Sequence, residues 1–124
     1  MEQFILEEFR CVVEEALQYN GNYLDLITKL HMSHAKMSRA AAKAITQCGC
    51  IGFDGAASKY GKTTKERAGF RGQMCDICRE ELEKAAGEHL FYLSGFLSAV
   101  GIDLYDIYLK ELNRQKLLGK YSLR

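Results

Sequence analysis

Proline and tryptophan are both absent from the 124 residues of this chain. Because proline is the residue that most often breaks or bounds a helix, its absence over this length favours long uninterrupted helices. No stretch approaches the ~18 apolar residues of a membrane-spanning helix. The acidic N-terminus also has neither the basic segment nor the apolar run of a secretory signal, so we expect a cytoplasmic protein with no membrane partner. The net charge of +1 does not indicate a nucleic-acid binder.

Apolar residues make up 48% of the chain, enough for a single domain (1–124) with its own core. Their helical spacing predicts an all-α fold class in which no segment is expected to form a strand. Asn22 and Asp103 are expected to cap the second and fourth helices, and Gly49 and Gly119 to end them. Cys11, on the apolar side of the first helix, is expected to be a small buried hydrophobe. The four main helices are expected at residues 2–19, 23–46, 76–100 and 104–118.

Four of the five cysteines form two tight pairs, Cys48-x-Cys50 and Cys75-x-x-Cys78. Each short turn presents two thiolates to one ion, and two such turns complete the tetrahedron of a structural zinc site. We interpret the segment 48–78 as a zinc-clamped insertion between the second and third helices. Three alternative interpretations stay open. The pairs could form disulfides, or Cys75 and Cys78 could form a redox-active dithiol. The metal could also be iron, which four thiolates bind as well as zinc.

A carboxylate-bearing helix runs from Glu83 into an apolar Leu-Phe-Tyr-Leu stretch at 90–93, and a Gly-Ile-Asp-Leu turn follows at 101–104. This sequence pattern resembles that of the MazG-type nucleoside triphosphate pyrophosphohydrolases, an all-α superfamily, over residues 80–112. The Ala-Lys-Ala-Ile ending of the second helix resembles the family more loosely. The resemblance implies a MazG-like helical bundle, a homodimer or higher homo-oligomer, and Mg²⁺ or Mn²⁺ held by acids from two helices.

The chain departs from that family at most of the metal-binding positions. Glu88 matches the final acid, but Ala85 stands where its partner is expected, and no acid occurs from Lys29 to Ile45. One carboxylate cannot assemble a magnesium site, because this hard cation takes several oxygen ligands. If the chain is an enzyme, Glu88 with His34, or with His31, is the candidate catalytic set. The alternative is that these are ordinary polar residues lining a groove between helices.

The glycine-rich segment 51–74 carries a series of basic side chains. They are candidates for binding the phosphates of a nucleotide substrate or a nucleic-acid backbone, and a solvated loop without any partner is the alternative. Only two aromatic residues accompany them, so a dedicated nucleic-acid module is not strongly indicated. The candidate substrate-binding residues are Lys59, Lys62, Lys65, Arg67 and Arg71.

Three functional hypotheses follow, in order of preference. The first is a divergent, non-catalytic MazG-like protein with a structural zinc site and a regulatory role, which binds a nucleotide or a protein partner. The second is an active nucleoside triphosphate pyrophosphohydrolase with a rearranged divalent-metal site. The third is a zinc-stabilised nucleic-acid-associated protein. The sequence does not decide whether the chain is an enzyme. The strongly apolar third helix favours a homodimer or a higher assembly.

Overall fold

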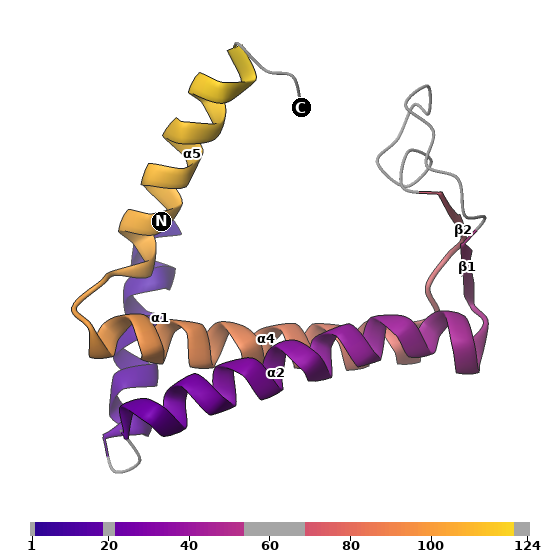
Figure 1. Cartoon of the computed structure of the whole chain (residues 1–124), viewed down its shortest axis with the longest axis horizontal. Helices are drawn as coiled ribbons and strands as arrows, with labels where there is room; N and C mark the ends of the chain where they lie inside the picture. The colour runs from indigo at the N-terminus through magenta and orange to yellow at the C-terminus, as the bar shows by residue number, and fades with distance from the viewer. Residues whose placement is uncertain (1, 19–21, 54–68, 121–124) are drawn as a thin grey trace. The chain divides into compact units, whose positions relative to one another are not determined.

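The computed structural model describes residues 2–18, 22–53 and 69–120 of the chain (Figure 1). Most of these residues are helical, which confirms the all-α fold class. The four expected helices are all present, with bounds within a few residues of the prediction. They are α1 (Glu2–Leu17), α2 (Tyr23–Lys43), α4 (Asp76–Ala99) and α5 (Leu104–Lys120), and a π-helical turn η1 (Ala44–Cys48) extends α2.

Two short strands interrupt the helical pattern, so the expectation of a chain without strands is wrong. β1 (Ile51–Phe53) and β2 (Phe70–Gly72) form an antiparallel pair in which Ile51 faces Gly72. Three-residue strands are shorter than the usual five or six residues, and they are too short for alternating polarity to be read from a sequence. Residues 54–68 between the strands lie outside the described residues, and with them Lys59, Lys62, Lys65 and Arg67.

The helix ends follow the expected capping chemistry with one exception. Asn22 Oδ1 accepts hydrogen bonds from the backbone N–H groups of Leu24 at 2.9 Å and Asp25 at 3.4 Å, which confirms it as the N-cap of α2. Asp103 Oδ1 accepts one from Tyr105 N–H at 3.1 Å and caps α5. Gly119 does not end α5, which continues to Lys120 because a single glycine is tolerated inside a helix at a modest cost.

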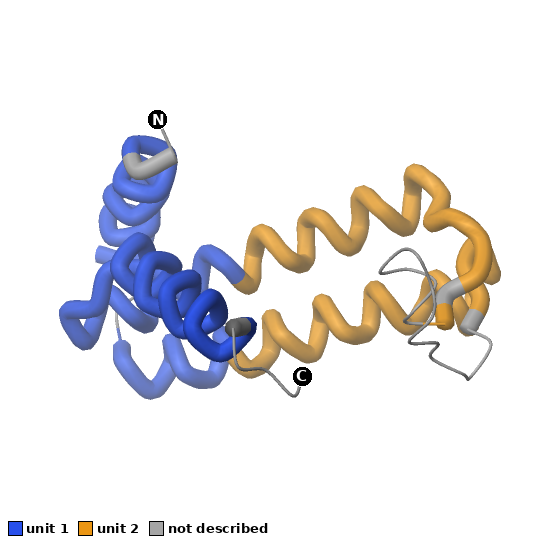
Figure 2. The backbone as a smooth tube through the Cα atoms, turned by 90° about the horizontal axis from the view of Figure 1, so that it is seen from above, with its two compact units in different colours: residues 1–30, 90–124 blue, residues 31–89 orange. Residues whose placement is uncertain are grey.

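The chain divides into two compact units (Figure 2). Unit 1 comprises residues 1–30 and 90–124, and unit 2 comprises residues 31–89. In unit 1, α1 packs against α5, and α1 also meets α4 where Gly95 lies against Leu17 and Val13. Val13 is fully buried there.

The expectation of a buried Cys11 is wrong, because its side chain is exposed. Cys11 lies two residues from Val13, which is about 200° around the helix axis. It therefore faces away from the side of α1 that packs.

Within the described residues no single helix is long and apolar enough to cross a membrane, although α4 and α5, bent by 100° at their junction, pass that test together on length and composition alone.

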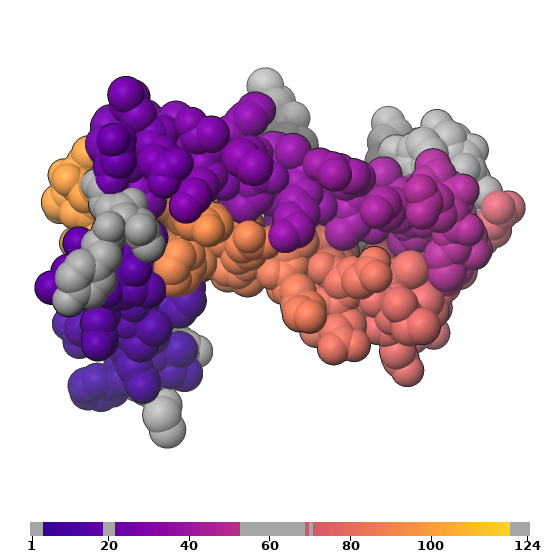
Figure 3. Space-filling view, turned by 90° about the horizontal axis from the view of Figure 1, so that it is seen from below, coloured from indigo at the N-terminus to yellow at the C-terminus, as the bar shows by residue number. Residues whose placement is uncertain are grey.

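Unit 2 is built on the C-terminal half of α2 and the N-terminal half of α4, which run antiparallel, side by side (Figures 2 and 3). Their side chains meet where Ser33 lies 3.0 Å from His89 and Lys36 donates to Glu88. The described buried residues of unit 2 all have small side chains. Burial of such residues removes little apolar surface from water, so the hydrophobic effect stabilises unit 2 only weakly. The buried residues in the described part of unit 2 are Ser33, Ala44, Gly69, Cys78 and Ala85.

Candidate metal centre

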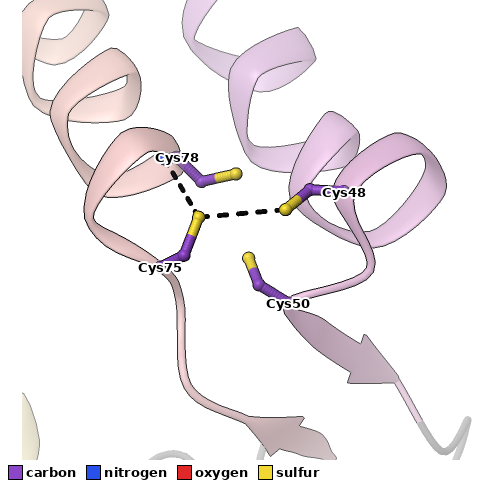
Figure 4. Close-up of side chains that lie close together, drawn as sticks. All are labelled: Cys48, Cys50, Cys75 and Cys78. Carbon is purple, nitrogen blue, oxygen red and sulfur yellow. Dashed lines mark hydrogen bonds between the residues drawn. The ribbon is translucent and has the colours of Figure 1, made fainter.

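Four cysteines meet at the end of unit 2 where α2 gives way to the sheet (Figure 4). Cys48 is the last residue of η1, and Cys50 directly precedes β1. Cys75 directly precedes α4, and Cys78 lies in the first turn of that helix. The side chains point toward one centre, two from the helical ribbon of η1 and α4 and two from the chain that connects these helices to the sheet (Figure 4). The structure therefore confirms that the two sequence pairs form one cluster.

The π-helical turn η1 and the glycine after it aim the first pair. Gly49 adopts a left-handed conformation (φ 78°) and donates its N–H to the Ala44 carbonyl oxygen at 2.9 Å, which ends η1 as the sequence predicts. The chain changes direction there, and the Cys50 thiol lies 3.8 Å from the same carbonyl oxygen. One buried alanine thus anchors the turn that carries both Cys48 and Cys50. Single π-turns of this kind are frequent at functional sites.

Gly72 supports the cluster from β2, a role that sequence reasoning missed. A Cβ atom at this position would lie 2.8 Å from the Cys50 carbonyl oxygen, closer than real Cβ contacts allow. Its φ of 84° is also a conformation that other residues rarely adopt. The sequence shows Gly72 only as one of several glycines. Its pairing with Ile51 could not be predicted, because the two residues are far apart along the chain.

The distances between the sulfur atoms fit a single metal ion. All four Sγ atoms lie within 4.8 Å of one another, and those of Cys48 and Cys75 are 3.8 Å apart. Four sulfurs at 2.3 Å from a tetrahedral ion are separated by about 3.8 Å. A disulfide needs a separation of about 2.05 Å, and all four cysteines are free thiols in the structure. The donor set therefore suits a metal that prefers sulfur, such as zinc or iron.

Hydrogen bonding gives Cys75 and Cys78 different acidities. The backbone N–H of Cys78 donates to Cys75 Sγ at 3.5 Å and, with the Cys78 thiol, lowers the pKa of Cys75 from its ordinary value of 9.0 to about 7. The hydrogen bond to Cys75, together with burial, raises the pKa of Cys78. Cys75 is thus partly ionised at neutral pH and can bind a metal as the thiolate, whereas Cys78 loses its proton only when a metal ion replaces it.

The candidate catalytic residues lie elsewhere in unit 2, on the facing sides of α2 and α4. Glu88 Oε2 accepts a hydrogen bond from Lys36 Nζ at 3.0 Å, so the carboxylate pairs with a cation. His34 is exposed, and its ring lies 5.7 Å from that of His89. His89 Nδ1 is in turn 3.0 Å from the buried Ser33 Oγ. Glu88 and His34 therefore each have a partner other than the one that the sequence suggested.

The remaining candidates are placed by the structure as follows. His31 is exposed on α2. Arg71, the one described member of the basic loop set, lies on β2, where its guanidinium group approaches Gly52 on the neighbouring strand.

No protein family, curated protein or solved structure matches this chain.

Proposed function

We propose that this chain is a zinc-clamped, non-catalytic binding protein with a MazG-like fold, which takes a nucleotide or a protein partner. The observation that carries the proposal is the cluster of Cys48, Cys50, Cys75 and Cys78. Four thiolates fill a tetrahedral zinc ion completely and leave no position for water or substrate. Such a site stabilises a structure and does not carry out chemistry on a ligand.

The composition of the unit 2 core supports a structural role for the metal. Its buried residues are small, so the two antiparallel helices gain little from hydrophobic burial. Small scaffolds of this kind commonly depend on a metal or another covalent staple. Zinc at the cluster would join the end of η1 to the start of α4 and add its binding free energy to folding. In the cytoplasm that the sequence predicts, thiols stay reduced and available for this purpose.

The pairing of carboxylates supports the absence of catalysis. A magnesium ion needs several oxygen ligands, usually from carboxylates on more than one element. Asp25 is the only acid of α2, and it pairs with Lys29 at 3.3 Å. On α4, Glu88 pairs with Lys36. α2 therefore offers cations where a nucleoside triphosphate pyrophosphohydrolase needs carboxylates, so the acids of α4 lack the second carboxylate-bearing helix that such a metal site requires.

The first part of the test is the metal itself. Protein purified without chelator is expected to contain one zinc ion per chain, measured by elemental analysis. Removal of the zinc under reducing conditions is expected to lower Tm by several degrees, because the clamp between η1 and α4 is lost. Cys78→Ser should lose the zinc, and Cys11→Ser, which lies outside the cluster, should retain it. Reduced protein without zinc or iron would refute the metal site.

The second part of the test is pyrophosphate release from a panel of nucleoside triphosphates with Mg²⁺ or Mn²⁺, on zinc-loaded protein. We expect no release above background. Release that disappears in Glu88→Ala would contradict a non-catalytic role and support the active enzyme with a rearranged metal site. Release that persists in this variant would point to a contaminating enzyme, and the proposal would stand.

A further inference from the structure

A groove of about 550 Å³ lies between α2 and α4 in unit 2, and no cysteine lines it. Ala40 on one helix and Ala85 on the other line it, and Ala85 is buried. Two small side chains opposite each other leave space that larger residues would fill. The volume lies within the range of small-molecule sites, about 300–1,000 Å³. All other residues that line the groove are charged, namely Lys36, Arg39, Lys43, Glu81, Lys84 and Glu88.

The basic residues form a row along one wall. Lys36, Arg39 and Lys43 are spaced i, i+3 and i+7, so they share one face of α2 over two helical turns, about 10 Å along the axis. Lys84 adds a fourth base from α4. With two acids among the lining residues, the groove carries a net charge of +2 in a chain whose total is +1. The groove is therefore a local region of positive charge in a nearly neutral chain.

Three of these bases have no acidic partner among the described residues. Lys36 uses Glu88, at 3.0 Å, but Arg39, Lys43 and Lys84 make no ion pair within the described part of the chain. Like charges around one concave surface repel each other and raise the local potential. This arrangement concentrates anions, and a bound anion would relieve the repulsion.

We propose that this groove binds a chain of phosphates directly through Arg39, Lys43 and Lys84, without a divalent metal. Inorganic triphosphate and the triphosphate of a nucleotide share this chemistry. An extended row of cations matches an extended anion better than a single phosphate. A guanidinium group beside two ammonium groups offers one bidentate and two point-charge contacts to phosphate oxygens. The inference rests on the proposed function, since it assigns the site and the ligand class to a binding protein.

The acids in the groove allow a prediction of a variant that binds triphosphate more tightly than the wild type. Glu88 holds Lys36 and adds a negative charge beside the expected position of the phosphates. Its neutralisation would free Lys36 and remove repulsion. We therefore expect Glu88→Gln to bind triphosphate several-fold more tightly, whereas mere damage to the helical pair would weaken binding.

The test is isothermal titration of zinc-loaded protein at low salt with no divalent ion added. The three ligands are inorganic triphosphate, ATP and a single-stranded oligonucleotide. The variant Arg39→Gln/Lys84→Gln removes two cations of the groove. Lys110→Gln/Lys116→Gln, on the exposed side of α5, removes the same net charge elsewhere and is the matched control.

We expect wild-type protein and the control to bind triphosphate and ATP equally well. The groove variant should lose roughly a hundred-fold in affinity, since a hydrogen bond to a charged group contributes about tenfold or more. An equal loss in both double variants would show non-specific attraction and overturn the inference. Binding of the oligonucleotide alone would overturn it too.

Two outcomes separate this inference from the proposed function. ATP binding that is unaffected in Arg39→Gln/Lys84→Gln would leave a nucleotide-binding protein but exclude this groove as the site. No binding of either phosphate compound by the wild type would also refute the groove. The proposed function would then depend on a protein partner and on the zinc and pyrophosphate measurements alone.

Discussion

Cys75 and Cys78 show how one helix start gives two neighbouring thiols different acidities. The backbone N–H of Cys78 stabilises the thiolate of Cys75, whereas the hydrogen bond to Cys75 and then burial raise the pKa of Cys78 and favour its neutral form. In the metal-free protein the cluster therefore carries a thiolate at Cys75 before it carries one at Cys78. A metal ion bound at the cluster would displace the proton of Cys78, because cysteine binds a metal as the thiolate.

This difference predicts the pH dependence of zinc affinity. Below about pH 7 the ion competes with a proton at Cys75, and above that value it does not, because the thiol is already ionised. Zinc affinity should rise with pH over the whole range measured. The slope of log affinity against pH should fall by about one above about pH 7, because one proton fewer is then displaced. Competition with a chromophoric chelator from pH 6 to 9 measures it. A change in slope only near 9.0, the ordinary pKa of a cysteine thiol, would contradict the folded arrangement of the metal-free cluster.

At the scale of elements, β2 can approach the backbone of Cys50 closely only because Gly72 has no side chain. Gly72 combines a positive φ with a carbonyl oxygen 2.8 Å from the position of a Cβ. Gly87, by contrast, lies inside α4 with open space around its Cβ position. Glycine is therefore required at position 72, by both backbone conformation and lack of space. At position 87 a larger side chain would fit.

Gly72→Ala is therefore expected to destabilise the protein by about 1–2 kcal/mol or more, since the left-handed conformation alone costs that much. It should also weaken zinc binding, because the Cys50 segment must move. Gly87→Ala is the matched control, and it should stabilise the protein by about 0.5–1 kcal/mol because alanine favours a helix interior. Thermal or denaturant unfolding of both variants, with zinc affinity, checks the pair. Equal effects of the two substitutions would contradict the steric role of Gly72.

At the scale of the whole molecule, the exposed apolar surface is unevenly distributed. Nearly all exposed large apolar side chains of the described residues lie in unit 1. Several line an apolar groove of about 440 Å³ between α1 and α5. α1 carries five acids and one base, and α5 carries four bases and two acids. Two copies could therefore match these helices in charge while covering the apolar surface, since an isologous interface presents the same patches twice. The exceptions, which lie in unit 2, are Met32, Ile45 and Ile77.

This distribution keeps the prediction of a homodimer or a higher homo-oligomer, with unit 1 as the interface. Leu112→Glu places a charge in the groove between α1 and α5, and it should shift the protein toward monomer. Met32→Glu, at a more exposed apolar residue of unit 2, should leave the assembly unchanged. Sedimentation velocity over a range of protein concentrations measures both. A wild-type protein that stays monomeric at high micromolar concentration would refute the prediction.

The sequence by itself determined the features that depend on neighbours along the chain. The four helices, the caps at Asn22 and Asp103 and the left-handed Gly49 follow from helical periodicity and capping chemistry, which act within a few residues. The cysteine cluster was also predictable, because two short pairs in one chain have few ways to satisfy a tetrahedral ion.

Only the tertiary structure decided the features that depend on which residues face each other across the fold. The pairing of Ile51 with Gly72, the ion pair of Lys36 with Glu88 and the basic groove all follow from the register of antiparallel elements. A shift of one helical residue turns a side chain by about 100°, so the sequence shows the charges but not their partners. Non-local register is the physical reason that the groove became visible only in the folded chain.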